Sequence, residues 1–385
     1  MAASIKLLTV VGARPQIIKA AAISRAIASG FADRIRETIV HTGQHYDANM
    51  SQVFFEELGI PGADVQLSVG SASQGAQTAR MMEGIEAQLL RDRPDVVLLY
   101  GDTNSTLAGA IAAAKLHIPV AHVEAGLRSW NKAMPEEVNR ITCDHCSTWL
   151  FCPTDTAVKN LKREGFLLER KGKPNANAPA VHMNGDVMFD NSMHFASLAA
   201  ERSTVLRDIG LLPGSYALVT VHRDHNTDAS GPLNGIFEAL LAITDAHDLH
   251  IVLPVHPRLL KCLDTIMDPA LRKAIETSPR MHLVPPAGFL DMIELERNAR
   301  LVLTDSGGVQ KEAFFFGKAC VILRPETEWV ELVENGQAVL AGADRNAITV
   351  ATGHFLSRGV PACPPLFGDG RAAARVCEVL VKDLG

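Results

Sequence analysis

Residues 95–140 read DVVLLYGDTNSTLAGAIAAAKLHIPVAHVEAGLRSWNKAMPEEVNR, and this stretch carries the clearest fold signal of the chain. It holds two apolar strand patterns, Val96–Tyr100 and Val120–Val123, separated by an alanine-rich helix pattern at about 106–116. The alternation predicts a β–α–β unit, whose two parallel strands end at the same edge of a sheet. Because ligands bind outside that edge in open α/β sheets, the stretch also predicts where a site lies.

Carboxylates follow both of these strands. Asp102 lies in GDTNS after the first strand, and Glu124 lies in HVEAGLR after the second. A third acid, Glu136, stands in PEEVNR at an expected helix start, and Arg128 lies between them in the sequence. Three carboxylates and a guanidinium near one sheet edge favour acid–base chemistry over a purely structural role.

The composition is that of a soluble globular protein. The chain has 385 residues, enough for two domains, and is 47% hydrophobic and 21% charged. No apolar run is long enough to cross a membrane, and no secretory signal is visible at the start, so a cytoplasmic protein without a membrane partner is expected. A net charge of −6 argues against nucleic-acid binding but is compatible with an anionic small ligand.

The seven cysteines are scattered along the chain and odd in number, so we expect free thiols. Cys143 and Cys146 have the spacing of half a zinc site, but no second half follows in the sequence. An ordinary helix is the favoured interpretation of this segment, and we expect no metal.

Strand and helix patterns alternate through the rest of the chain, which predicts two Rossmann-like, doubly wound α/β domains. The first is expected at 1–200 and carries the acids. The second is expected at 201–368, and an amphipathic helix in 369–385 packs back onto either of them.

The N-terminal strand, Ile5–Val11, leads through Gly12 into a helix that begins near Pro15 and carries Arg14 and Lys19. This junction is a candidate anion site, although Arg14 as a plain helix cap is the alternative. It lacks the GxGxxG fingerprint, so neither a nicotinamide nor a flavin cofactor is predicted.

A second strand, at 37–41, is followed by Gln44 and His45, which are polar groups on an expected loop at the same edge. A ligand contact and a structural role are about equally supported for this loop. A short helix is expected after it, at 54–58.

In the second half, Asp305-Ser306-Gly307-Gly308 follows a buried strand at 301–303. Small residues let the backbone approach a diphosphate, and the opening N–H groups of the next helix suit such an anion. Glu312, about one turn further on, is placed to accept hydrogen bonds from a ribose. A plain tight turn is the alternative interpretation.

Three more candidates follow neighbouring strands of this half: His222 and Arg223 after 216–221, and His256 after 251–255. A histidine beside a phosphate can help a leaving group to depart. Together the two halves predict a nucleotide-bound substrate on the second domain, with its reacting part facing the acids of the first.

These stretches resemble the non-hydrolysing UDP-N-acetylglucosamine 2-epimerase family. The segments that carry the resemblance are GARPQIIKAA, HTGQHYDANM, YGDTNSTLAGA, HVEAGLRS, MPEEVNR, GDVMFDN, VTVHRDHN, PVHPR and LTDSGGVQKEA, in order over about residues 10 to 335. The resemblance implies a glycosyltransferase B-like pair of Rossmann-like domains around a central cleft, a homodimer, a UDP-activated amino sugar as ligand and no cofactor.

The resemblance also implies the reaction and residue roles. The C2 proton is removed, UDP is expelled to leave a glycal, and UDP adds back with a proton delivered to the opposite face. The implied catalytic residues are Asp102, Glu124, Glu136 and His222, with the three acids handling protons as a set. The implied substrate-binding residues are Arg14, Lys19, Ser306, Gly307, Gly308 and Glu312. Position at the strand ends adds Gln44, His45, Arg128, Arg223 and His256.

Several motifs depart from the common family pattern. Gln16 stands where an acid is usual, and ETEWVELVENG replaces the common segment after the last strand pattern. These variants resemble the branch that acts on UDP-2,3-diacetamido-2,3-dideoxy-D-glucuronate and makes its manno epimer for bacterial surface polysaccharide, the lipopolysaccharide O-antigen. Loss of the acid at Gln16 would remove repulsion from a substrate carboxylate. Plain UDP-N-acetylglucosamine is the alternative substrate, and a hydrolysing 2-epimerase, a retaining glycosyltransferase or a non-catalytic binding protein are the alternative classes.

Overall fold

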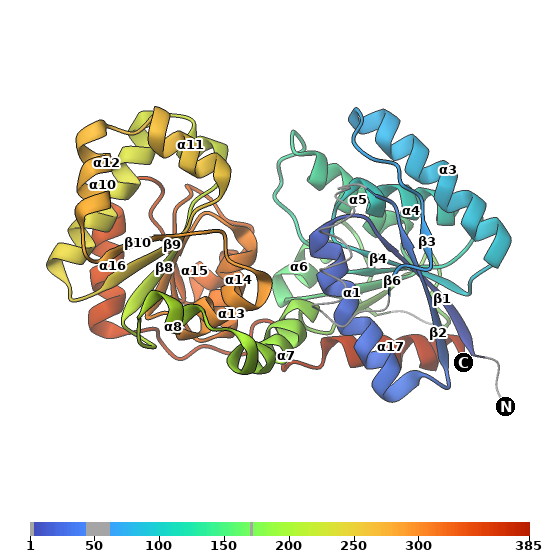
Figure 1. The fold of residues 1–385 in the computed structure, drawn as a ribbon. Coiled ribbons are helices and arrows are strands. Elements are labelled where there is room, and N and C mark those ends of the chain that lie inside the picture. Colours follow the sequence, from blue (N-terminus) through green and yellow to red (C-terminus); the bar gives the residue numbers. More distant parts are fainter. Residues whose placement is uncertain (1–3, 44–61, 170–171) are drawn as a thin grey trace. The chain divides into compact units, whose positions relative to one another are not determined.

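The computed structural model describes residues 4–43, 62–169 and 172–385 of the chain. The chain folds into two compact units. Unit 1 comprises Met1–Asn191 and Pro365–Gly385, and unit 2 comprises Ser192–Pro364. Each unit is a parallel sheet covered by helices (Figure 1).

Unit 1 is built on a seven-stranded sheet with the order β3-β2-β1-β4-β5-β6-β7, and all its pairings are parallel. The order reverses direction between β1 and β4, which is the topological switch point where doubly wound sheets bind ligands. The strands are β1 Ile5–Val11, β2 Ile35–His41, β3 Val65–Gln66, β4 Val96–Tyr100, β5 Val120–Val123, β6 Trp149–Cys152 and β7 Ala180–Met183.

The helices of unit 1 cover this sheet, and α7 continues into unit 2. They are α1 Arg14–Ala26, the π-helix η1 Ile27–Phe31, α3 Gln74–Asp92, α4 Asn104–Lys115, α5 Pro135–Cys146, α6 Asp155–Arg163, α7 Val187–Arg202 and α17 Ala372–Leu384. The last helix, α17, packs against α1 and η1. The carboxylate of Asp190 accepts hydrogen bonds from the N–H groups of Ala372 and Ala373, and these bonds fix the start of α17.

The predicted β–α–β unit is confirmed as β4, α4 and β5. Every residue of β4 and β5 is buried, as expected for parallel strands covered on both faces. At Gly109 of α4, a Cβ atom would lie 2.7 Å from Cδ2 of Leu99, so glycine lets this helix approach β4 closely. The helix expected at 54–58 lies outside the described residues.

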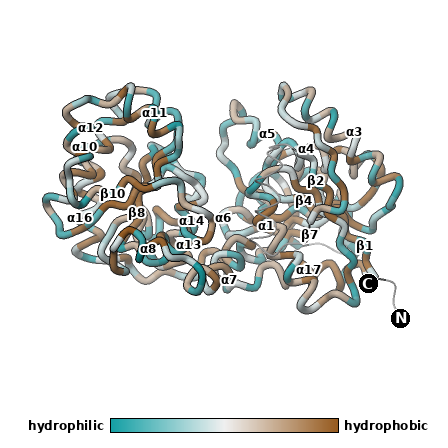
Figure 2. The backbone as a smooth tube through the Cα atoms, in the orientation of Figure 1, coloured by the Kyte–Doolittle hydropathy of each residue, from teal (hydrophilic) through white to brown (hydrophobic). Residues whose placement is uncertain are grey.

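Unit 2 repeats the design with a six-stranded parallel sheet of order β10-β9-β8-β11-β12-β13. Hydrophobic residues concentrate on its strands (Figure 2) and on the helix faces packed against them. The strands are β8 Tyr216–Thr220, β9 His250–Pro254, β10 Met281–Val284, β11 Leu301–Thr304, β12 Ala319–Ile322 and β13 Ala338–Leu340. The helices are α8 Val205–Ile209, α9 Asp224–Thr227, α10 Ser230–Ala246, α11 Pro257–Thr265, α12 Pro269–Thr277, α13 Phe289–Asn298, α14 Gly307–Phe315, α15 Val330–Glu334 and α16 Arg345–Arg358.

Two further expectations can be compared with the structure. All seven cysteines are free thiols, as predicted. Within the described ranges, no helix combines the length and the hydropathy needed to cross a bilayer.

Candidate active site

The carboxyl ends of β4 and β5 bring two of the predicted acids to neighbouring positions. Tyr100 and Val123 are paired across the two strands, and Asp102 and Glu124 follow them. Glu124 has a φ of 71°, which is uncommon for a residue with a side chain. Such backbone strain is found where the surrounding structure over-determines a functional position.

Lys19 of α1 reaches the carboxylate of Glu124 in an ion pair. The two side chains are 12% and 10% exposed, so the pair is largely shielded from water. A Cβ atom at Gly101 would lie 3.2 Å from both the Lys19 Nζ and the Glu124 Oε2 atoms. Glycine at this position therefore leaves room for the pair, and Lys19 both orients the carboxylate and offsets its charge.

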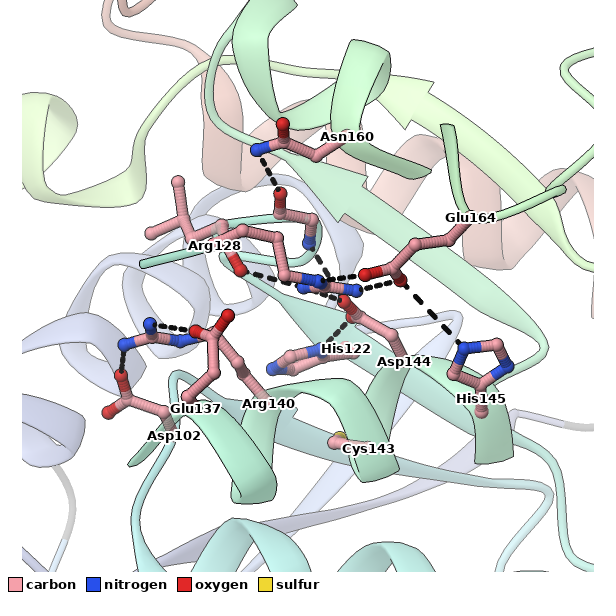
Figure 3. Close-up of polar contacts among 12 residues, drawn as sticks. Asp102, His122, Arg128, Glu137, Arg140, Cys143, Asp144, His145, Asn160 and Glu164 are labelled. Atoms are coloured by element: carbon pink, nitrogen blue, oxygen red, sulfur yellow. Dashed lines mark hydrogen bonds and ion pairs between the residues drawn. The ribbon is translucent and has the colours of Figure 1, made fainter. Parts of the chain in front are cut away.

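Asp102 is held from α5. Arg140 forms an ion pair with the Asp102 carboxylate and another, at 2.7 Å, with Glu137 (Figure 3). The Asn139 side-chain amide donates a hydrogen bond of 2.9 Å to the Asp102 carbonyl oxygen. The Asp102 side chain is still 32% exposed, so its carboxylate remains accessible to a ligand.

Glu136 occupies the first turn of α5 and is exposed. Within the described part of the chain it forms no hydrogen bond or ion pair with Asp102 or Glu124. Its neighbour Glu137 is buried and accepts hydrogen bonds from the Ser129 and Trp130 N–H groups at 3.0 and 2.9 Å. The two adjacent acids therefore differ in environment, and only Glu137 is tied to the local backbone.

Arg128 does not lie where a substrate contact was predicted. Its side chain is fully buried, and its guanidinium lies 2.8 Å from Asp144 and 2.6 Å from Glu164 (Figure 3). Burial would lower the pKa of Arg128, but the two carboxylates raise it above its ordinary value. The guanidinium thus forms ion pairs inside the unit, and the structure does not support a substrate contact for Arg128.

Gln16 is also an internal group. Its Oε1 atom accepts hydrogen bonds from Gly12 and Ala13 at 2.9 and 3.2 Å, and its amide nitrogen donates to the Tyr100 carbonyl and the Thr106 hydroxyl at 2.9 and 3.0 Å. The residue is 1% exposed. Gln16 therefore joins the β1–α1 turn to the end of β4, and its burial argues against the predicted effect on a substrate carboxylate.

The remaining candidates of unit 1 divide into two groups. Arg14 is exposed at the first position of α1, past the end of β1. Gln44 and His45 lie outside the described residues.

In unit 2, the ends of β8 and β11 bring His222 and Asp305 together. The His222 Nδ1 atom lies 2.9 Å from Asp305, and both the His222 and the Arg223 N–H groups donate to the same carboxylate at 3.0 Å. The Asn226 side-chain amide adds a fourth hydrogen bond of 3.0 Å. Burial would raise the pKa of Asp305, but the hydrogen bond from the His222 ring and those from the backbone lower it.

This arrangement defines the orientation of His222. Because Asp305 is an ionised acceptor, the His222 Nδ1 atom must donate, and the Nε2 atom is the one presented to a ligand. The His222 side chain is 49% exposed, whereas that of Asp305 is fully buried. Asp305 therefore acts as the orienting partner of His222, a role that sequence reasoning had missed although it had singled out the motif.

The predicted diphosphate loop opens α14. Ser306 is the N-cap residue, and Gly307 and Gly308 form the first turn, whose N–H groups have no acceptor within the helix. A Cβ atom at Gly307 would lie 2.5 Å from the Glu328 Oε1 atom. The Trp329 indole donates a hydrogen bond of 3.0 Å to the Gly307 carbonyl. The variant segment noted in the sequence thus supports this loop directly.

Glu312, the predicted ribose acid, has an unexpected neighbour in Glu296 of α13. Glu296 is 1% exposed, and within the described residues no donor reaches either of its oxygen atoms. Burial raises its pKa well above the usual range, and the Glu312 charge and a hydrogen bond with Glu312 raise it further. The raised pKa favours the protonated form of Glu296, which is the form able to share a proton with Glu312.

Arg223 and His256 both lie past strand ends of unit 2, as predicted. Arg223 is the N-cap residue of α9 and His256 that of α11, and both are exposed. No group of three or more His, Cys, Asp or Glu residues in the described ranges is arranged to hold a metal ion.

Two parallel doubly wound sheets, each with polar and ionisable side chains at its carboxyl edge, define a glycosyltransferase B-like protein. Comparison with solved structures supports this class, since Phytolacca americana UGT2 shares the fold at a TM-score of 0.58 and 13% identity, covering 99% of this chain and 94% of that one.

Sequence comparison identifies the family within this class. Residues 31–381 match the family described as UDP-N-acetylglucosamine 2-epimerase. The UDP-2,3-diacetamido-2,3-dideoxy-D-glucuronate 2-epimerase of Pseudomonas aeruginosa is 47% identical, covering 98% of this chain and 99% of the relative. The Methanocaldococcus jannaschii UDP-GlcNAc 2-epimerase, solved with UDP-GlcNAc and UDP, is 38% identical with a TM-score of 0.81, covering 98% and 100% of the two chains. The chain belongs to the UDP-N-acetylglucosamine 2-epimerase family, and it is an isomerase that acts on a UDP-sugar.

Proposed function

We propose that this enzyme is a non-hydrolysing 2-epimerase whose preferred substrate is UDP-2,3-diacetamido-2,3-dideoxy-D-glucuronate, which it converts to the manno epimer. The observation that carries the proposal is the 47% identity to the Pseudomonas aeruginosa enzyme of that name over nearly the full length of both chains. The motif variants, above all the segment that contains Trp329, support the same branch. The buried position of Gln16 means that this residue gives no independent support.

The reaction needs an elimination and its reversal. A base takes the C2 proton, a double bond forms between C1 and C2, and the C1–O bond breaks with its electron pair remaining on UDP. Readdition of UDP with a proton on the opposite face of C2 gives the epimer. Two proton-handling groups are therefore required, one for each face, and no net oxidation takes place.

We assign the proton-handling groups to unit 1. Asp102 and Glu124 follow paired strands, and each is oriented by a cation, Arg140 and Lys19 respectively. Glu136 remains the third member of the set. Because every member is a carboxyl group and the faces of C2 are not distinguished by sequence, the acids stay assigned together.

We assign the nucleotide to unit 2. The first turn of α14, with Ser306, Gly307 and Gly308, suits the diphosphate. Glu312, oriented by Glu296, suits the ribose hydroxyls. His222 presents Nε2 and can stabilise or protonate the departing phosphate oxygen. Arg14, Arg223 and His256 are further proposed contacts of the substrate.

UDP-N-acetylglucosamine is the second candidate substrate, favoured by the M. jannaschii structure with that ligand. Proton NMR in deuterated water, with each sugar supplied separately, distinguishes the two. We expect a manno-configured UDP-sugar with deuterium at C2 from the diacetamido-glucuronate, and slow or no exchange from UDP-N-acetylglucosamine. Preference for the latter would refute the proposed substrate. Release of free sugar would indicate a hydrolysing enzyme, and absence of C2 exchange with both sugars would exclude epimerisation of either.

We also infer a cytoplasmic homodimer that serves surface polysaccharide synthesis, on the strength of the family resemblance. Light scattering of the purified protein tests the dimer, and a monomeric mass would contradict it.

A further inference from the structure

A histidine occupies the middle of the sheet of unit 1. His122 is the third residue of β5, and it is completely buried. Its Nε2 atom lies 2.8 Å from the Gly101 carbonyl oxygen, and its Nδ1 atom lies 2.7 Å from the Asp144 carboxylate. Figure 3 shows the ring beside Asp144. Both ring nitrogens are therefore engaged by oxygen atoms.

Both of these oxygens are acceptors. A backbone carbonyl has no proton to donate. The second oxygen of Asp144 lies 2.8 Å from the Arg128 guanidinium and accepts from the Gly126 N–H group at 3.1 Å. With a guanidinium, an N–H group and His122 around it, Asp144 is ionised. Because neutral imidazole has only one N–H group, two acceptors require the doubly protonated, charged ring.

The surroundings of the two buried groups shift their pKa values in the directions that this geometry requires. Burial alone would lower the pKa of His122, whereas the charges and hydrogen bonds of Cys143 and Asp144 raise it. Burial would raise the pKa of Asp144, but the His122 hydrogen bond and the Arg128 charge lower it. Among the described residues, Cys143 and Asp144 of α5 are the titratable groups that act on the ring, and Arg128 acts on it through Asp144. Gly101 supplies only its carbonyl.

The bonded partners of His122 flank the two acids. Gly101 directly precedes Asp102. Through Asp144, the ring is linked to Gly126, two residues after Glu124. Gly101, Glu124 and Gly126 all have positive φ angles, of 60°, 71° and 79°. Glycine adopts this conformation freely, whereas Glu124 keeps it only because surrounding contacts determine it.

We propose that His122 is a permanently charged positioning residue, an imidazolium that fixes the two loop ends carrying Asp102 and Glu124. The charge itself follows from the contacts alone, and only its effect on turnover rests on the proposed function. His122 touches neither substrate nor reacting atoms in this proposal. It acts through the Gly101 carbonyl and through Asp144.

The charge is tested first, on the unmodified protein. Nitrogen-15 NMR of histidine-labelled enzyme at pH 8, with the signal identified by its loss in His122→Gln, reports how many ring nitrogens carry a proton. We expect two at His122. A single protonated nitrogen at His122 would overturn the proposal. This measurement does not depend on turnover, so it stands even if neither UDP-sugar is the substrate.

The positioning role is tested with three variants. In His122→Gln, the amide NH₂ group can donate to the Gly101 carbonyl, but the amide oxygen then faces the Asp144 carboxylate. Both of these are acceptors, so the contact with Asp144 is lost. In the double variant with Asp144→Asn, the Asn amide can donate to that oxygen, and both contacts return. Asp144→Asn alone should leave the histidine neutral, with one ring nitrogen accepting from the Asn amide.

We expect kcat to fall about 100-fold in His122→Gln, as for a misplacement of about 1 Å at an active site. KM should change little, because the proposed nucleotide contacts lie in unit 2. The double variant should recover about tenfold or more of the lost kcat, a coupling that independent sites do not show. The exposed His354→Gln serves as the matched control. A wild-type kcat in His122→Gln, or a double variant no better than the single one, would refute the positioning role.

Discussion

Replacement of Asp305 by Asn should lower kcat about 100-fold without unfolding the protein. One carboxylate oxygen accepts from His222 N–H, Arg223 N–H and the Asn226 amide, each at 3.0 Å. The other faces the His222 Nδ1 atom at 2.9 Å. An Asn side chain can keep the first set with its oxygen, which places its NH₂ group opposite Nδ1. The ring must then accept at Nδ1. The doubly protonated ring, which would pass its Nε2 proton to the departing phosphate oxygen, therefore loses the carboxylate that stabilises it.

The magnitude follows from the exposure of the ring. The same substitution in a serine-protease triad costs about 10⁴ in kcat, because the histidine there is confined in the wrong tautomer. Here the His222 side chain is 49% exposed, so water competes for it and the other tautomer is easier to reach. We therefore expect about 100-fold, equivalent to about 2.7 kcal/mol in the activation free energy.

The pH dependence of stability gives a second readout. The folded pKa of Asp305 is lowered, so its contribution to the free energy of unfolding is present above the unfolded pKa of about 3.9 and is lost as the pH falls through the folded value. The Asn variant lacks this titration. The difference in Tm between wild type and variant should therefore be constant near neutral pH and shrink below about pH 4.

Initial rates measured by NMR with the accepted UDP-sugar provide the assay. Asp248→Asn is the matched control, because the Asp248 side chain is 92% exposed in the same unit. In a His222→Ala background the Asp305 change should add little further loss, since both act through one ring. A wild-type kcat in the folded Asp305→Asn protein, or fully additive losses, would refute the reasoning.

Substitutions at three further residues probe other parts of the site. Lys19→Met removes the ammonium group beside Glu124 and should lower kcat about 100-fold, whereas Lys19→Arg should be less affected in the same rate assay. Equal rates for wild type and both variants would contradict a role for the Lys19–Glu124 ion pair. Glu296→Gln should be more stable than wild type in urea unfolding, and the difference should grow above about pH 4.3. The reason is that a carboxyl group whose folded pKa is raised lowers the free energy of unfolding of the wild-type protein as the pH rises. A pH-independent difference would contradict a raised pKa of Glu296. Glu296→Leu should also weaken UDP binding by calorimetry, because Glu312 loses its donor. Arg128→Met should lower the free energy of unfolding by about 3–5 kcal/mol, because Asp144 and Glu164 both lose the buried guanidinium that pairs with them, and it should leave KM unchanged. An unchanged stability with a raised KM would restore the sequence-based role.

Sequence reasoning was most successful where a local pattern carries the physics. Fully apolar runs such as Val96–Tyr100 can only be strands covered on both faces, so the parallel sheets could be predicted from them. Residues directly after those runs, such as Asp102, Glu124 and His222, had to lie at the carboxyl edge. Family motifs in the same segments then identified the class of enzyme.

Sequence reasoning was least successful where partners come from different elements. Arg128 was predicted to contact the substrate and Arg140 of the same stretch was not singled out. In the structure Arg140 reaches Asp102, and Arg128 is buried between Asp144 and Glu164. No spacing rule distinguishes them, because the left-handed turns after β5 determine which way each segment leaves the sheet. The Glu296–Glu312 contact joins two helices and has no local signal.

The amino-acid sequence by itself determined the two doubly wound sheets, the edge at which the chemistry lies and the family, because hydrophobic periodicity and strand-end motifs are local properties. Only the tertiary structure decided which charges neutralise one another. The state of His122 shows why: a buried ionisable group takes its charge from the donors and acceptors that other elements bring to it, here Gly101 after β4 and Asp144 from α5.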